Sequence, residues 1–149
     1  MIRPARATDL GALLEIEQAA QISPWSETAL SQSLHAGLGV WVSEDAAGQV
    51  QGWAGLRVVA DEAEILNIAV HPAAQRQGMA RALMQAVLEA AVQSGVEKVF
   101  LEVRAGGEAA QALYLSLGFV ACGRRKGYYA TAAGGREDAL LMRWDCPRR

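Results

Sequence analysis

The spacing of hydrophobic and polar residues divides the chain into helices and strands. Apolar residues recur every three to four positions in some stretches, which predicts helices, and alternate or run together in others, which predicts strands. The expected helices cover residues 8–20, 26–37, 78–94 and 108–118. The expected strands cover residues 1–5, 39–45, 50–60, 63–70, 98–105, 119–125 and 138–145.

Polar residues and proline mark the ends of these elements. Thr8 and Ser26 are expected to cap the first two helices, Pro72 to end a strand, and residues 126–137 to form the last loop. The order of elements predicts a mixed α/β (α+β) fold in one domain, residues 1–149. Its central sheet would be mostly antiparallel, with one parallel strand pair and about four flanking helices.

Composition and charge narrow the class of protein. Hydrophobic residues make up 52% of the 149, which is enough for a sizeable core. The net charge of -2 argues against a nucleic-acid partner. Because the sequence shows neither a bilayer-spanning apolar run nor a signal peptide, we expect a cytoplasmic protein that does not bind membranes.

The cysteines and histidines do not form a recognisable metal motif. Cys122 and Cys146 lie far apart in the sequence, and His35 and His71 lack clustered carboxylates. We therefore expect no metal site. Cys122, in an apolar stretch, is expected to be a buried thiol.

The stretch QRQGMAR, residues 75–81, opens the third helix and is the first candidate site. A helix N-terminus offers N–H groups and the positive end of the helix dipole to an anion such as phosphate. Gly78 would let the backbone approach a ligand, and Arg76 and Arg81 would add charged hydrogen bonds. The Walker and dinucleotide glycine patterns are absent. Spacing alone leaves open both a phosphate site and an ordinary solvated helix start.

A family resemblance decides between these interpretations. Gln75-x-x-Gly78-x-Ala80 resembles the acetyl-CoA signature of the GCN5-related N-acetyltransferases. The stretches LNIAVHP, LEVRA and ALYLSLGF resemble the successive core motifs of that family, in the same order. SPWSE and the ending GYYATAAGGREDALLM resemble its bacterial ribosomal-protein-alanine branch. The resemblance covers nearly the whole chain.

The resemblance implies acetyl-CoA as acetyl donor, held where the sheet splays between strands 63–70 and 98–105. The backbone of Ile68, Ala69 and Val70 would bind the pantetheine arm, and the N–H group of Val70 would stabilise the oxyanion. These contacts are compatible with core packing of the side chains. The pyrophosphate would be bound by the backbone of Arg76, Gln77, Gly78, Met79, Ala80 and Arg81.

The resemblance also assigns the chemistry. Glu102 would be the general base, acting through a water, and Tyr114 would protonate the leaving thiolate or hold it by a hydrogen bond. From the residues alone, Glu102 would be interpreted as a solvated strand residue or a partner of Arg104, and Tyr114 as a core residue. Gly107 stands where the family has an asparagine that contacts the cofactor, so we expect that contact to be lost.

The acceptor groove would be lined by Trp25, Tyr128 and Tyr129, although a packing role for Trp25 and a surface role for the tyrosines remain open. Glu137 and Asp138 could attract a basic peptide or could be solvated. The resemblance implies acetylation of a protein N-terminus, that of alanine in a small-subunit ribosomal protein. Acetylation of a small amine or a lysine, or a non-catalytic acetyl-CoA-binding module, are the alternatives.

Overall fold

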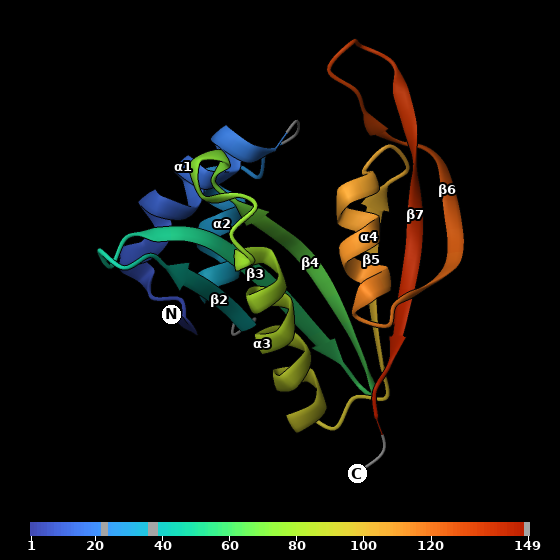
Figure 1. Cartoon of the computed structure of the whole chain (residues 1–149), viewed down its shortest axis with the longest axis horizontal. Helices are drawn as coiled ribbons and strands as arrows, with labels where there is room; N and C mark the ends of the chain where they lie inside the picture. The colour runs from blue at the N-terminus through green and yellow to red at the C-terminus, as the bar shows by residue number, and fades with distance from the viewer. Residues whose placement is uncertain (22–23, 36–38, 148–149) are drawn as a thin grey trace. The chain divides into compact units, whose positions relative to one another are not determined.

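The computed structural model describes residues 1–21, 24–35 and 39–147, and these form one mixed sheet with helices (Figure 1). The strands are β1 (Ile2–Pro4), β2 (Gly39–Glu44), β3 (Val50–Val59), β4 (Glu62–Val70), β5 (Lys98–Arg104), β6 (Val120–Ala130) and β7 (Arg136–Asp145). The α-helices are α1 (Leu10–Ala20), α2 (Glu27–His35), α3 (Met79–Gln93) and α4 (Glu108–Ser116). Two short 3-10 turns, η1 (Ala7–Asp9) and η2 (Pro72–Ala74), precede α1 and α3.

The sheet has the expected mixed topology. Its strand order is β1-β2-β3-β4-β5-β7-β6. The pairs β1–β2, β2–β3, β5–β7 and β7–β6 are antiparallel, whereas β4 and β5 are parallel. The β4–β5 register covers three pairs in the first half of each strand, from Glu62↔Lys98 to Glu64↔Phe100. The predicted fold class, with its single parallel pair in the described sheet, is confirmed.

The chain folds as two compact units, and the first comprises Met1–Arg57 and Leu66–Ala90. In its core, α1 and α2 pack on the sheet. The buried residues include Leu13 on α1, Leu30 on α2, Val42 on β2 and Trp53 on β3. Helix α3 covers the other face. Because Leu83 and Met79 would lie about 3 Å from a Cβ at position 52, Gly52 allows α3 to pack closely on β3.

The second unit comprises Val58–Ile65 and Ala91–Arg149. On β5, Val99, Leu101 and Val103 are buried and the intervening residues are half-buried, which is the alternation of a strand with one covered face. The indole N–H of Trp144 donates to the carbonyl of Leu117 at 3.0 Å, which satisfies a backbone group at the end of α4. This hydrogen bond fixes α4 on the β7 strand.

Three details differ from the sequence-based expectation. Thr8 lies inside η1 and does not cap α1; the N-cap of α1 is Asp9, whose side chain makes no capping hydrogen bond to that helix and accepts from the Arg6 N–H at 2.7 Å. The last loop is shorter than predicted, because β6 continues to Ala130 across a register shift. Cys122 is exposed, not buried, because the described residues of β6 form the edge of the sheet.

Ser26, by contrast, caps α2 as predicted, its Oγ accepting from the Ala29 N–H at 3.1 Å.

Residues 36–37, where the second helix was expected to end, lie outside the described part of the chain. Among the helices that the structure describes, none has the length and hydrophobicity needed to span a bilayer.

Candidate active site

The loop before α3 has the backbone geometry of an anion-binding helix start. Arg76 and Gly78 have positive φ angles, 65° and 78°, with one residue of ordinary φ between them. Alternation of backbone hand turns successive N–H groups toward one side, as in anion-binding nests. The Ala82 N–H makes the first helical hydrogen bond, to the Gly78 carbonyl at 3.1 Å, so the amides of Met79 and Ala80 precede the helical ladder.

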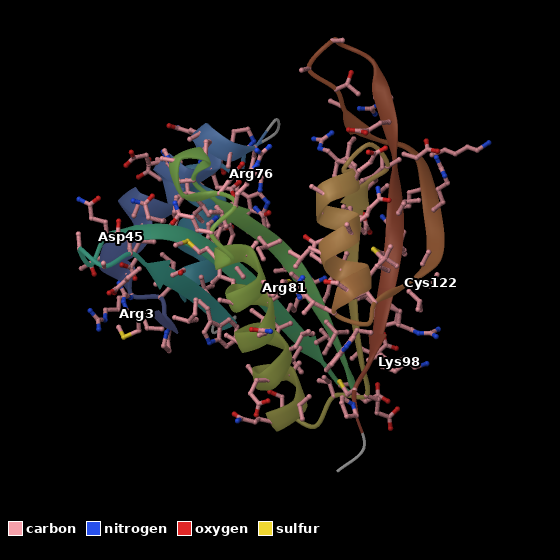
Figure 2. All side chains as sticks on the ribbon, in the orientation of Figure 1. Arg3, Asp45, Arg76, Arg81, Lys98 and Cys122 are labelled. Carbon is pink, nitrogen blue, oxygen red and sulfur yellow. The ribbon has the colours of Figure 1, made fainter. Side chains whose placement is uncertain are left out.

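The glycine at position 78 is required by conformation. No protein atom lies within 4 Å of a Cβ built there, but the positive φ is rarely adopted by other residues. Arg76 adopts a positive φ without being glycine, which strains its backbone. Figure 2 shows Arg76 in this loop and Arg81 on α3, and both side chains are exposed. Both guanidinium groups therefore lie at the protein surface near the helix start.

The end of β4 is tied to this loop. The side-chain amide of Gln75 donates to the carbonyl of Val70 at 3.1 Å. Ala69 and Val70 are buried, and Ile68 is half-buried. Gln75, whose side chain the sequence analysis did not assign, thus links the strand expected to bind pantetheine to the loop expected to bind pyrophosphate.

Trp25 is half-buried and packs edge-on against Trp53, with ring centroids 5.6 Å apart. Its backbone N–H donates to the carboxylate of Glu17 at 3.0 Å. Glu17 has no exposed surface and was missed by the sequence analysis. A signal existed: Leu10, Leu13 and Glu17 follow helical spacing, so a carboxylate occupies an apolar position of α1.

In the second unit, Glu102 lies on β5 between two buried residues, on the half-buried face. Its carboxylate forms an ion pair with Arg125 of β6, whose Nη2 is 3.3 Å from Oε1. Arg104 does not pair with Glu102, contrary to one alternative above, but with Glu137, at 2.9 Å. The candidate base therefore has a cationic neighbour from the edge strand.

Tyr114 is 6% exposed and lies on the buried side of α4, against Phe119 at 5.9 Å between ring centroids. Burial raises the pKa of its phenol to about 12, and Tyr129 adds to that rise. Tyr114 is therefore neutral throughout the physiological range and carries a proton that it can donate. The core role and the proposed acid role are compatible.

Tyr129 is electrostatically coupled to both candidate catalytic groups. Its pKa is raised first by burial and then by the negative charge of Glu102. The guanidinium of Arg104 lies over its ring, 4.5 Å from the centroid. Tyr128 is 49% exposed and contacts Tyr129 edge-on at 5.0 Å. The two candidate acceptor tyrosines thus form one aromatic pair beside the candidate catalytic residues of this unit.

The carboxylates of Glu137 and Asp138 each bind an arginine and a backbone N–H group. Glu137 accepts from Arg104 and, at 3.1 Å, from the N–H of Gly106. Asp138 pairs with Arg124 at 2.5 Å and accepts from the N–H of Gly127 at 2.9 Å. Because both carboxylates already have cationic partners, they are poor candidates for attracting a basic peptide.

Gly107 is the N-cap of α4, and its N–H donates to the carbonyl of Arg104 at 2.9 Å. A Cβ there would lie 3.2 Å from that same carbonyl oxygen, which is a tight contact.

Within residues 1–21, 24–35 and 39–147, no cluster of three or more His, Cys, Asp or Glu side chains could hold a metal ion.

The structure thus gathers the candidate residues in two sets. The first unit holds the candidate cofactor strand and loop, with Trp25; the second holds the candidate base, acid and tyrosine pair, with Gly107.

Residues 10–119 match the model of the Acetyltransferase (GNAT) family. The chain belongs to this acyltransferase family, as the order of its motifs predicted.

Individual relatives are similar over almost their whole length. The chain is 43% identical over 142 residues to the ribosomal protein bS18-alanine N-acetyltransferase of Escherichia coli (strain K12), covering 95% of this chain and 94% of that one. It is 37% identical to the Haemophilus ducreyi enzyme of the same name, covering 95% and 97%. The crystal structure of the Escherichia coli ribosomal-protein-S18-alanine N-acetyltransferase matches with a TM-score of 0.93 at 39% identity, covering 100% and 95%. The predicted family fold is confirmed.

Proposed function

We propose that residues 1–149 form one N-acetyltransferase domain that transfers acetyl from acetyl-CoA to the N-terminal alanine of ribosomal protein bS18. The observation that carries this proposal is the 43% identity, over 95% of the chain, to the Escherichia coli enzyme of that name. We assign the reaction to the cytoplasm because the proposed acceptor is a ribosomal protein.

Acetyl-CoA would be bound by backbone groups. The alternating backbone of Arg76 and Gly78 supports a pyrophosphate site at the start of α3. The exposed Arg76 and Arg81 side chains would add charge-assisted hydrogen bonds. The backbone of Ile68 to Val70 would hydrogen-bond the pantetheine arm as an added strand would.

The acceptor amine would attack the thioester carbonyl carbon directly. The new C–N bond forms as negative charge builds on the carbonyl oxygen, where the Val70 N–H would stabilise it. The amine proton would pass to Glu102 through a water. An α-amino group has a pKa of about 8, against about 10.4 for lysine, so a modest base is sufficient for an N-terminal substrate.

Collapse of the tetrahedral intermediate breaks the C–S bond and releases a thiolate. The Tyr114 phenol, with its pKa raised to about 12 by burial, is a weaker acid than an ordinary thiol of pKa about 8.5. This order favours a stabilising hydrogen bond from Tyr114 to the sulfur over complete proton transfer. The thiolate would then take its proton from water at neutral pH.

The acceptor peptide would lie against Trp25, Tyr128 and Tyr129. Tyr128 is exposed, and Tyr129 is half-buried beside Arg104, so this pair offers a rigid aromatic surface with a polar edge. Gly107 would leave the expected asparagine contact with acetyl-CoA unmade.

The test is acetyl transfer to a panel of peptides that differ in the first residue, read by mass spectrometry. We expect turnover on the alanine-initiated bS18 peptide and none on polyamines or on internal lysines. Glu102→Gln should lower kcat about 100-fold or more, and Tyr114→Phe should also lower it, with acetyl-CoA binding unchanged in both.

Turnover on small amines or lysine in place of N-terminal alanine would replace this proposal with the corresponding activity. Acetyl-CoA binding without turnover on any amine would show a binding module. Full activity in both variants would remove the assigned roles of Glu102 and Tyr114.

A further inference from the structure

Glu17 is a buried charge that the proposed chemistry does not use. Its side chain lies on α1 with no exposed surface. Taking a carboxylate out of water costs several kcal/mol, and an apolar side chain of similar size is often as good or better for stability. A carboxylate in this position therefore suggests a task beyond filling the core.

The carboxylate receives hydrogen bonds from three different segments of the first unit. Oε1 accepts from the indole N–H of Trp53 at 3.0 Å and from the side-chain amide of Asn67 at 2.8 Å. Oε2 accepts from the backbone N–H of Trp25 at 3.0 Å. One side chain thus fixes β3, β4 and the segment before α2 relative to one another.

A neighbouring glutamine extends this network along β4. The amide of Gln21 donates to the Oδ1 of Asn67 at 3.0 Å and to the carbonyl of Ile68 at 3.4 Å. Asn67 therefore has its amide nitrogen on Glu17 and its oxygen on Gln21, and it can adopt only one orientation. Burial raises the pKa of Glu17, while these surrounding hydrogen bonds oppose the rise.

The same carboxylate also binds both members of an aromatic pair, Trp25 and Trp53. Trp25 stacks edge-on against Trp53, with an interplanar angle of 75°, and Glu17 accepts a hydrogen bond from each of these residues. The backbone of one tryptophan and the indole of the other are held by the two oxygens of one carboxylate. The Trp25 ring therefore packs against an indole that the same carboxylate holds.

We propose that Glu17 is a positioning residue for the acceptor peptide, which orients Trp25 through its backbone and through Trp53 and ties that segment to Asn67 on β4. This inference rests on the proposed function, in which Trp25 contacts the acceptor. Glu17 itself has no contact with substrate, because its side chain is fully buried.

The test uses the full chain and the alanine-initiated peptide. Glu17→Gln keeps the shape but puts an amide nitrogen where one oxygen accepts. Glu17 would then lose one of the hydrogen bonds that hold Trp25 and Trp53. We expect the peptide KM to rise about tenfold as a result, which corresponds to one hydrogen bond to a charged group. The KM for acetyl-CoA should change less than about twofold, because its proposed contacts are with backbone groups. The near-ultraviolet circular dichroism of the tryptophan pair should also change.

Asp9→Asn is the matched control. Asp9 is also a buried carboxylate of the first unit, but its partners are Arg3 and the Arg6 N–H at the start of the chain. This variant should lower stability without changing the peptide KM. If Glu17→Gln does not fold, Asn67→Leu removes one of the three donors, and its peptide KM should rise about threefold.

An equal rise in both KM values, or an equal effect of Asp9→Asn, would reduce Glu17 to a structural residue and overturn the inference. An unchanged peptide KM in the folded variant would do the same. These outcomes require an active wild-type protein, whereas a wild-type protein without turnover on the peptide would overturn the proposed function and the inference together.

Discussion

The guanidinium of Arg125 forms an ion pair with the carboxylate of Glu102 across the sheet, although β7 lies between their strands. The Glu102 side chain is 18% exposed and that of Arg125 is 54% exposed. The proposed base is therefore paired with an arginine that is largely exposed to solvent and belongs to the edge strand of the described sheet. The protonated amine of an incoming peptide would compete with that guanidinium for the same oxygen.

Arg125→Gln removes this competitor. We expect the peptide KM to fall about threefold at low salt, and the gain to shrink at high salt, because an exposed charge is screened. Stability should change by less than about 1 kcal/mol, as for other exposed ion pairs. Arg124→Gln is the control, because it removes the same charge from the same strand but breaks the pair with Asp138. A higher peptide KM in Arg125→Gln would show instead that Arg125 binds the peptide.

Gly78→Ala should weaken acetyl-CoA binding about tenfold, measured by calorimetry, because relief of the positive φ moves the loop amides. The variant should also lose about 1 kcal/mol of stability. Gly134→Ala is a matched control: its φ is 86° and the space around its Cβ is likewise open. It should lose similar stability and bind acetyl-CoA normally. Equal binding by the two variants would contradict an anion site at Gly78.

Gly107→Asn should tighten acetyl-CoA binding by restoring the side-chain contact that the family resemblance implies. Asparagine is also a favourable N-cap, which would offset the 3.2 Å contact of its Cβ with the Arg104 carbonyl. Gly107→Ala separates the two effects, since it adds the Cβ without the amide and should not tighten binding. An unchanged or larger dissociation constant for Gly107→Asn would count against the contact.

Tyr114 should make the stability of the protein depend on alkaline pH. Its folded pKa of about 12 exceeds the ordinary value of 10.0, so its contribution is complete below pH 10 and is lost as the pH rises through 12. The full loss is about 3 kcal/mol, at about 1.36 kcal/mol per pKa unit. Urea unfolding of the wild type and of Tyr114→Phe across this range should diverge accordingly. Parallel curves would show that the phenol is not buried in solution.

Glu137 should act at the opposite end of the pH scale. Its hydrogen bond from Arg104, and then that from the Gly106 N–H, hold its pKa below the ordinary 4.5. Its contribution to stability is therefore present above that value and is lost as the pH falls through the lowered pKa. Glu137→Gln should be less stable than the wild type at neutral pH, and the difference should vanish in acid. A difference that persists in acid would assign the effect to packing.

Hydrophobic periodicity located the described α-helices, and the described strands other than β6, to within a few residues, because it reports which face of an element is covered. It failed at β6, whose exposed residues up to Ala130 are arranged by pairing with β7 and not by a covered face. Glu17 and Arg125 escaped prediction for a related reason. Their partners are 36 residues away at Trp53 and two strands away at Glu102, and local patterns do not encode such distances.

Local backbone conformation in the motifs was easier to predict than the side-chain partners of the motif residues. The positive φ angle at Gly78 could be anticipated, since positive φ and glycine are locally linked, and it supports the proposed anion site. The Arg104–Glu137 pair was not predicted, because the register of β5 on β7 decides which carboxylate meets the arginine. Side-chain partners across a sheet follow from register, which a single sequence specifies weakly.

The exposed thiol of Cys122 gives the native chain a chemical handle. The other cysteine, Cys146, is half-buried, and burial raises the pKa of its thiol, so little of its reactive thiolate is present at neutral pH. A maleimide fluorophore should therefore attach at Cys122 without any engineered substitution (Figure 2). Placed three residues from Arg125 on the same strand, such a label would report in real time when a peptide displaces the guanidinium.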